Sequence, residues 1–556
     1  MKRSFKTITA TGPSNPRRRF AVLAMLGALV PAAAFAAQSE APETPAQALA
    51  RSATPLNVVE TLLESGNNEA VQSYYEERLA KGQADAANRV RCLQELYAGN
   101  DAGAQQALEI LNAKDSWAQS RANYLSGLVS LQSGFVESRS DHFVVRVPAE
   151  DAFLGDYALP ALENAHAKFA DVLGAFSSGT AVVEIYPTVE SFSFASTLSP
   201  EAIARTGTVA VFKFGRLMIL SPRATARGYR WLDALVHQYA RAAVRRLSGS
   251  RCPVWLEEGT ARYLTIVWRR TDEFVLPPYD EGLLAAAAST APAPGSVPWV
   301  PFDKMEPAFV YLPDPATVAL AESEASDAVA YVVDEHGLDG LRSLLTALKD
   351  RPREEAFAAA VGSTEEELEA GWRESLAEET LNAPAGALSS AVQLRPLEDA
   401  VWAGAAAEPF LRAGDRLRQQ NQWAAAAAQY RKGLEAAPDN GLLMTRLART
   451  LLASGTPEGA EPLLRRAAEK NPAFAEPFVL MGDTFFDDGR YEEAQAVLQS
   501  ALEINPFDPK VHEILGLIAV DVGNFAEARR SLQLALRFDP ENDAVAQALK
   551  RMPKRR

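Results

Sequence analysis

The chain has 556 residues, of which 47% are hydrophobic and 23% charged, an ordinary composition for a globular protein long enough to form several domains. Acidic residues outnumber basic ones by 71 to 56, which gives a net charge of −15. A surface this acidic repels a phosphate backbone, so the composition argues against a nucleic-acid partner.

Residues 1–36 have the pattern of an export signal. A basic start without acids precedes an Ala- and Leu-rich run over 20–36, which ends in the small-x-small cleavage pattern Ala34-Phe35-Ala36. Arg17-Arg18-Arg19-Phe20 resembles a twin-arginine signal, and a Sec signal with a basic start fits equally well. Both predict a periplasmic or secreted bacterial protein, with no integral membrane span after signal removal. Residues 37–54, rich in Ala, Pro and Glu, are expected to form a disordered linker.

The next region, residues 55–137, is helical by its hydrophobic pattern. Apolar residues recur at helical spacing in segments that we interpret as two hairpins similar to degenerate repeats, namely Val58–Glu77, Asp85–Tyr97, Ala102–Asn112 and Trp117–Gln132. Cys92 lies in this region and Cys252 in the one that follows. They could form a disulfide in an oxidising compartment or serve as two small buried apolar side chains.

Residues 138–382 mix strands and helices. Apolar runs predict strands at His142–Val147 and Ala181–Tyr186, and a hairpin over Thr208–Phe214 and Arg216–Leu220 that turns at Gly215. Helical spacing predicts helices over Leu159–Leu173, over Tyr229–Leu247, around Glu258, and near 321–335, 338–348, 353–361 and 364–380. A stretch rich in Ala and Pro over 276–316 is expected to be a loop. The region therefore predicts an α+β domain.

Two neighbouring helical segments of this region carry a motif. Residues 231–241 read Trp-Leu-Asp-Ala-Leu-Val-His-Gln-Tyr-Ala-Arg, and residues 253–263 read Pro-Val-Trp-Leu-Glu-Glu-Gly-Thr-Ala-Arg-Tyr. Zinc peptidases of the gluzincin type place His-Glu-x-x-His on one helix and a third ligand, a Glu, on the next. The second segment closely resembles that Glu helix, and the order of elements over 138–382 resembles the peptidase MA-like family of gluzincins. The resemblance implies a zincin-like fold, with His237 and Glu258 at ligand positions.

The motif departs from the family pattern at two chemically decisive positions. Arg241 replaces the second His, and a guanidinium has no lone pair to give to a metal. Gln238 occupies the general-base position, and an amide cannot accept a proton at neutral pH. We therefore expect no catalytic residue, no metal and no cofactor in this domain.

Helix geometry indicates what replaces the metal. Arg241 follows His237 by four residues and shares its helix face, with Asp233 one turn earlier. Arg241 would project toward the zinc position of active relatives and pair with Glu258, since an unpaired buried carboxylate is costly; alternatively, Arg241 faces solvent. We interpret Glu257 as a solvated neighbour, and Asp233 as either an orienting partner of His237 or an ordinary acid in the first turns of a helix.

The C-terminal region repeats with a period of 34. After an Ala-rich linker over 383–406, four units span residues 407–542, and residues 543–556 form a short cap with a basic end. Prolines close each unit and small residues recur inside it, at Pro438, Pro472, Pro506 and Pro540 and at Gly414, Ala448, Gly482 and Gly516. The pattern resembles tetratricopeptide repeats, whose small residues lie where the two helices of a hairpin cross.

One repeat position predicts a binding surface. Leu452, Phe486 and Val520 are apolar and spaced by 34, and Asp415 and Asp483 lie nearby at another equivalent position. An apolar stripe with acidic neighbours would suit an extended or helical segment of a partner that carries basic residues. The alternative is that the three apolar side chains only pack between repeats.

Together these patterns predict an α+β zincin-like central domain flanked by helical repeats. We expect an exported interaction or scaffold protein with a catalytically inactive peptidase-like domain, whose repeats bind a protein or peptide partner. The alternative is an active zinc metallopeptidase with a rearranged site, for which zinc would be the cofactor. A third possibility is that the apolar cleft beside the Glu258 helix binds peptide without cleaving it.

Overall fold

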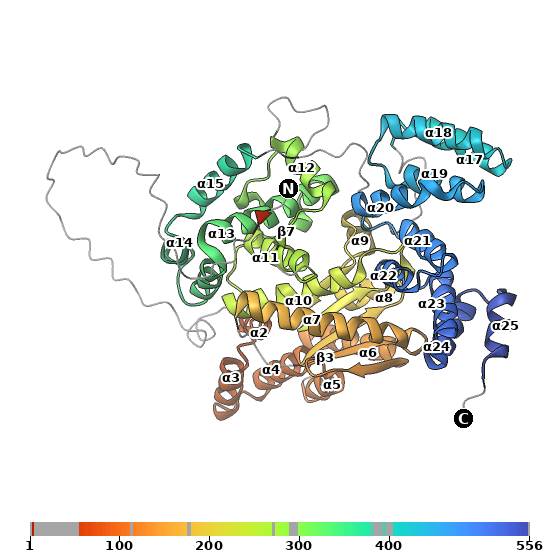
Figure 1. Ribbon diagram of the computed structural model, residues 1–556. Helices are drawn as coiled ribbons and strands as arrows, with labels where there is room; N and C mark the ends of the chain where they lie inside the picture. The colour runs from red at the N-terminus through yellow and green to blue at the C-terminus, as the bar shows by residue number, and fades with distance from the viewer. Residues whose placement is uncertain are drawn as a thin grey trace, which may run out of the picture.

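The computed structural model describes residues 3–4, 55–111, 115–174, 180–269, 273–288, 298–379, 381, 392, 394 and 404–553. A mixed sheet lies at the centre, with the N-terminal helices along one side and the C-terminal helical hairpins along another (Figure 1). All of the predicted signal segment except residues 3–4, the predicted linker over 37–54 and most of the predicted linker over 383–406 lie outside these residues. Of the helices in the described ranges, none combines the length and apolar composition that a membrane crossing requires.

The N-terminal region is helical, as expected. Its helices are α2 (Pro55–Glu64), α3 (Asn68–Ala80), α4 (Ala84–Tyr97), α5 (Asp101–Glu109) and α6 (Ser116–Gln132). The segment predicted as one helix over Val58–Glu77 is two helices. Gly66 adopts a left-handed φ of 72°, and the Asn67 side chain accepts a hydrogen bond from Ala70 N to start α3.

The sheet contains the predicted strands and one that the pattern missed. Within the described residues its order is β2 (Phe135–Arg139), β3 (Phe143–Pro148), β4 (Ala181–Tyr186), β6 (Arg216–Leu220) and β5 (Ala210–Lys213). The inner pairs β3–β4 and β4–β6 are parallel, and both edge strands are antiparallel to their neighbours. Because β2 belongs to the sheet, the boundary expected between 137 and 138 falls inside a strand.

Helices cover the sheet and carry the motif. After β3 come the short 3-10 helix η1 (Ala149–Leu154) and α7 (Gly155–Leu173), and β4 leads into α8 (Val189–Ser196) and α9 (Pro200–Thr206). The hairpin of β5 and β6 turns at Phe214 and Gly215, both with positive φ, as the sequence predicts. A 3-10 turn, η2 (Pro222–Ala224), then precedes the motif helices α10 (Trp231–Ser248) and α11 (Val254–Val267).

The end of the middle domain is more ordered than its composition suggests. Part of the expected loop over 276–316 is helical, as α12 (Pro278–Ala288), η3 (Phe302–Met305) and η4 (Phe309–Tyr311). The expected closing helices form α13 (Pro315–Asp350), which bends at Gly337, then α14 (Arg353–Val361) and α15 (Glu365–Ala377). A small two-stranded ladder pairs β1 (Arg3–Ser4) with β7 (Glu273–Phe274).

A buried arginine joins the N-terminal helices to the sheet. Arg216 on β6 is completely buried, and its guanidinium donates to Asp101 at the start of α5, to the Leu96 carbonyl and, at 3.0 Å, to Glu184 on β4. Two carboxylates therefore compensate a charge that would otherwise be costly to bury. Cys92 is buried nearby, and both Cys92 and Cys252 are free thiols.

The C-terminal region forms the predicted helical hairpins. They pair α17 (Glu408–Gln419) with α18 (Trp423–Ala436), α19 (Gly441–Ala453) with η5 (Pro457–Gly459) and α20 (Ala460–Lys470), α21 (Glu476–Asp487) with α22 (Tyr491–Leu502), and α23 (Pro509–Asp521) with α24 (Phe525–Phe538), before α25 (Asp543–Arg551). A Cβ atom on Gly414 would lie 2.4 Å from the Tyr430 ring. Because Gly482 and Gly516 are similarly close to Leu498 and Leu532, the small residues do mark helix crossings.

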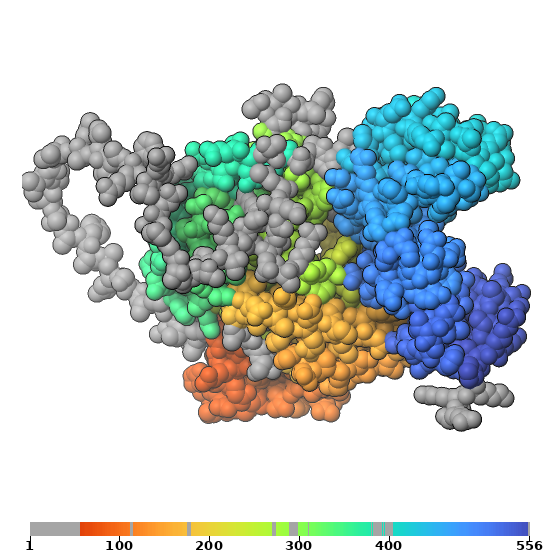
Figure 2. Space-filling view, viewed as in Figure 1, coloured from red at the N-terminus to blue at the C-terminus, as the bar shows by residue number. Residues whose placement is uncertain are grey.

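The last hairpins dock onto the middle domain. Trp231 donates its indole N–H to the Leu502 carbonyl at 3.1 Å, and Tyr229 N donates to the Ile504 carbonyl at 3.0 Å. Phe153 of η1 lies 5.4 Å from Phe507, measured between ring centroids. Figure 2 shows the blue repeats in contact with the yellow and orange surface of the middle domain. The linker residue Val392 also reaches this domain, because its carbonyl would lie 3.4 Å from a Cβ on Gly207.

Candidate functional site

Two adjacent helices place the motif residues opposite one another. His237, Gln238 and Arg241 lie on α10, and Glu257 and Glu258 lie on α11. Close packing fixes α11 at this point. A Cβ atom on Gly259 would lie 2.2 Å from the Ala325 carbonyl of α13, so only glycine lets the two helices approach here.

Arg241 forms the ion pair that helix geometry predicts. Its Nη2 atom lies 3.0 Å from Glu258 Oε1 and 2.8 Å from Glu257 Oε1. His237 Nε2 lies 3.1 Å from the other Glu258 oxygen, and Arg241 Nη1 donates to Gln238 Oε1 at 3.5 Å. Burial alone would raise the pKa of Glu258, but the Arg241 charge and the His237 hydrogen bond lower that pKa to about 2. The carboxylate therefore stays ionised and shared.

Glu257 is not the solvated neighbour that we expected. It is only 8% exposed, and its Oε1 atom accepts hydrogen bonds from Arg241 Nε and Arg245 Nε, both at 3.0 Å. Arg245 extends the network to α2 through Glu64, whose Oε2 atom lies 3.4 Å away. Residue spacing could not reveal this role, because Arg245 reaches Glu257 from another helix, α10, and Glu64 reaches Arg245 from α2.

Asp233 does not orient His237. Its carboxylate accepts hydrogen bonds from Arg230 and, at 2.7 Å, from Arg269. Burial would raise the pKa of Asp233, but the two guanidinium groups lower it. Arg269 also lies 2.6 Å from Glu503 of the repeats, so Asp233 belongs to the contact between the domains.

The donor set around α10 and α11 does not fit a catalytic zinc ion. Such an ion takes three protein ligands and keeps one open position for water. Here the two ligand-type side chains, His237 and Glu258, bond to each other, and Arg241 brings a positive charge where a third donor is needed. Within the described residues, no group of three or more His, Cys, Asp or Glu side chains is arranged to hold a metal ion. The arrangement is an ion-pair network.

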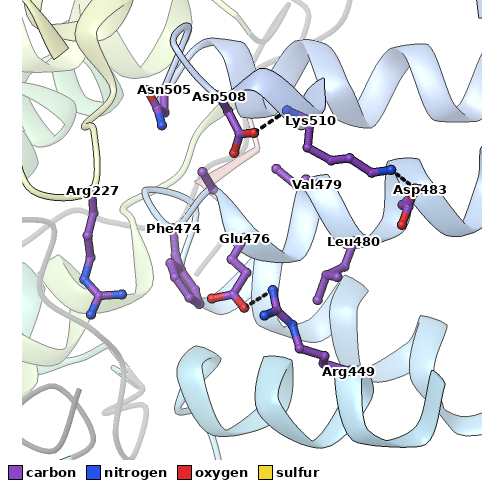
Figure 3. Close-up of a pocket in the computed structure, with 11 residues that line it drawn as sticks. Arg227, Arg449, Phe474, Glu476, Val479, Leu480, Asp483, Asn505, Asp508 and Lys510 are labelled. Atoms are coloured by element: carbon purple, nitrogen blue, oxygen red, sulfur yellow. Dashed lines mark hydrogen bonds and ion pairs between the residues drawn. The ribbon is translucent and has the colours of Figure 1, made fainter. Parts of the chain in front are cut away.

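A second candidate site lies on the inner face of the repeats. A cavity of about 360 Å³ is lined by first helices of successive hairpins, the connections between hairpins and one middle-domain residue, Arg227 (Figure 3). Its other lining residues are Arg449, Phe474, Ala475, Glu476, Val479, Leu480, Asp483, Asn505, Asp508 and Lys510. Ligand pockets typically measure about 300–1,000 Å³, so the cavity has the size of a binding pocket.

The repeat period explains which residues line this pocket. Arg449 and Asp483 are 34 residues apart, and so are Glu476 and Lys510, so each pair occupies equivalent positions on successive first helices. The period of 34 is visible in the sequence and could have identified these four residues. Arg227 could not be found in this way, because it reaches the pocket from another domain.

The structure brings one of the expected binding residues into the pocket. Asp483 lines it, whereas Asp415 accepts a hydrogen bond from the Tyr430 hydroxyl at 2.7 Å. Leu452 and Phe486 are partly buried and pack against the core that the second to fourth hairpins share. Val520 packs against the core of the last hairpin and α25.

Comparison with known proteins identifies the C-terminal region. A family model described as "Tetratricopeptide repeat" matches residues 417–477, 451–518 and 485–552. The C-terminal hairpins are tetratricopeptide repeats. The match does not extend to residues 138–382, for which the peptidase-like resemblance stays a hypothesis. No curated protein matches the chain.

Solved structures with likeness to the chain include other repeat proteins. MamA is 24% identical over 24% of this chain and 80% of its own, with a TM-score of 0.23. The tetratricopeptide repeat protein TTC0263 of Thermus thermophilus is 23% identical over 26% and 79% of the two chains, with a TM-score of 0.24. YrrB, described as a repeat protein with an unusual peptide-binding site, is 20% identical over 40% and 97%, with a TM-score of 0.24.

Proposed function

We propose that this chain is an exported interaction protein that combines tetratricopeptide repeats with a catalytically inactive gluzincin-like domain. The repeats bind an extended segment of a partner protein. The middle domain serves as the rigid platform on which they dock. The observation that carries the proposal is the ion pair between the Arg241 guanidinium and Glu258, because it occupies the carboxylate that peptidase chemistry would need as a metal ligand.

Three features of the motif support inactivity. The cation repels a metal, the His237–Glu258 bond ties up both ligand-type side chains, and Gln238 provides no base. Metal entry would require Arg241 to leave Glu258, whose buried negative charge that guanidinium compensates. The ion pair therefore competes with a metal ion for this carboxylate.

Metal content of the purified chain tests inactivity. The chain without residues 1–36 should contain well under one zinc per molecule by elemental analysis, and a chelator should leave its melting temperature unchanged. Stoichiometric zinc that survives dialysis, with measurable cleavage of a casein substrate, would support the active metallopeptidase instead.

The pocket on the repeats supports the binding role. Its walls combine partly buried apolar side chains, such as Val479 and Leu480, with charged side chains from two domains. Tetratricopeptide solenoids present such an inner face to partner segments. Crosslinking tests this site: a photoreactive residue in place of Leu480 should capture the partner, and one in place of the exposed Arg431 on α18 should not.

Export rests on the composition of residues 1–36. A fusion of this segment to a reporter that folds only outside the cytoplasm distinguishes export from retention. Lys-Lys in place of Arg17-Arg18 blocks the twin-arginine route and leaves the Sec route open.

A further inference from the structure

The pocket on the repeats is positively charged at one end. Arg446 Nη1 and Arg449 Nη2 lie 3.1 and 2.5 Å from the same Glu476 oxygen, so two guanidinium groups share that carboxylate. Arg446 also lies 3.5 Å from Asp415, whereas the Arg449 side chain keeps 41% of its surface exposed. Arg227 adds a further cation from the middle domain. This end can therefore accept an anionic group.

The opposite end of the pocket is negatively charged. Lys510 Nζ lies 3.0 Å from Asp483 Oδ1 and 3.6 Å from Glu513 Oε1. The Asp508 carboxylate caps α23 by accepting a hydrogen bond from Lys510 N at 2.9 Å. The Lys510 ammonium thus lies between two carboxylates, with Asp483 39% exposed, and the Asp508 carboxylate adds a further negative charge to the wall of the pocket. Figure 3 shows Lys510 and Asp483 on one side of the pocket and Arg227 on the other.

Apolar side chains lie between the two charged ends. Phe474, in the connection between α20 and α21, is only 5% exposed. Val479 and Leu480 lie on α21 and are partly buried. All three line the cavity. An apolar side chain of a ligand would lose its contact with water on entering this part of the pocket, which favours binding.

We propose that the pocket binds an extended peptide in which an acidic, an apolar and a basic residue follow one another. This inference rests on the proposed function and specifies the partner's chemistry. The acidic residue faces Arg227 and Arg449, the apolar residue packs on Phe474 and Leu480, and the basic residue faces Asp483. Charge complementarity fixes the direction of the peptide, because a reversed peptide places like charges together at both ends.

The middle domain takes part in this recognition. Gly228, which follows Arg227, adopts a φ of 75°, and a Cβ atom there would lie 2.3 Å from the Ile504 carbonyl. Tyr229 N donates to that same carbonyl. Docking of the repeats on the middle domain therefore places Arg227 at the pocket, and repeats without the middle domain lack this cation.

Peptides of matched composition test the proposal. The full chain without residues 1–36 is titrated, by fluorescence anisotropy, into labelled peptides with a Glu-Leu-Lys centre and into the reversed Lys-Leu-Glu centre, each flanked by Gly and Ser. The forward peptide should bind about tenfold more tightly, and the preference should weaken as salt rises. A peptide with Ser in place of Leu should bind weakly in either order.

Charge reversal in the protein provides the specific control. Arg227→Glu should weaken the forward peptide about tenfold and favour a peptide with Lys in place of Glu. Arg431→Glu makes the same charge change at an exposed position on α18, outside the pocket, and should alter nothing.

The outcomes separate this inference from the proposed function. Equal affinity for forward and reversed peptides, with affinity lost when Leu is replaced, overturns the charge order but keeps a peptide-binding groove. No binding of the forward peptide at millimolar concentration overturns the inference. In that case the crosslinking experiment tests the proposed function independently. A photoreactive residue in place of Leu480 that captures no partner would overturn that function as well.

Discussion

Arg241 Nη2 lies 3.0 Å from Glu258 Oε1, so a guanidinium pairs with the carboxylate that the proposed gluzincin resemblance would make a metal ligand. The same Arg241 atom also contacts Glu257, so one guanidinium of α10 forms ion pairs with two successive carboxylates of α11. These ion pairs link the two helices, so removing the guanidinium should lower the stability of the chain.

Arg241→Ala should destabilise the chain by about 3 kcal/mol or more, because it leaves the Glu258 carboxylate without its guanidinium partner and Glu257 with Arg245 alone. Glu258→Gln should also destabilise, and the double variant should recover part of the loss. Urea unfolding of the four proteins gives the coupling energy. Additive effects of the two substitutions would show that the side chains do not interact.

Gln238→Glu together with Arg241→His should give the chain a measurable affinity for zinc, since the pair restores a ligand and a base at the family positions. Titration calorimetry measures the affinity. Gln238→Glu alone keeps the Arg241 cation and should bind no more zinc than the unmodified chain. A double variant without zinc affinity would mean that α10 and α11 do not have gluzincin geometry.

Phe486→Ser should lower the melting temperature and leave binding of the forward peptide unchanged. Phe486 stacks on Tyr491 with a centroid separation of 5.9 Å and packs on the core of the repeats, outside the pocket. Loss of a large partly buried side chain costs on the order of 2–3 kcal/mol. Thermal unfolding and anisotropy separate the two effects. Loss of binding at unchanged stability would place the groove at Leu452, Phe486 and Val520 instead.

Gly228→Ala should loosen the repeats from the middle domain, because the added methyl meets the Ile504 carbonyl. Gly489→Ala is the matched control: Gly489 has a similar φ of 74°, but nothing lies within 4 Å of an added Cβ. Small-angle X-ray scattering should show a larger radius of gyration for the first variant only. An unchanged radius for both would argue against a fixed contact between the domains.

Glu324 on α13 should make the chain less stable as pH rises. The residue is fully buried, and burial raises the pKa of its carboxyl to about 8. Because this pKa lies above the unfolded value, the contribution of Glu324 is fully present below about pH 4.5 and is lost as pH rises toward 8. Glu324→Gln can still accept the hydrogen bond from Val300 N and should flatten this decline in a series of melting temperatures. An identical decline in the variant would assign it to other groups.

Local patterns predicted the elements of this protein well. The period of 34 placed the hairpins, and Gly414, Gly482 and Gly516 lie where helices cross, because close packing leaves no room for a Cβ there. The hairpin at Gly215 followed from the alternation of its strands and the need for a positive φ. The strand at Phe135–Arg139 was missed, since an edge strand with exposed residues lacks the apolar run of an inner strand.

The contacts of the candidate sites were likewise predicted only in part. Helical spacing alone placed Arg241 on the face of His237, and the high cost of an unpaired carboxylate predicted its pairing with Glu258. Spacing did not predict the burial of Glu257 by Arg245, the engagement of Asp233 by Arg269, or the arrival of Arg227 at the pocket. Each of these contacts joins residues from different elements or domains. A sequence determines periodicity, and with it which residues share a helix face, but only tertiary packing decides which faces meet, because that choice depends on the burial and charge balance of the whole chain.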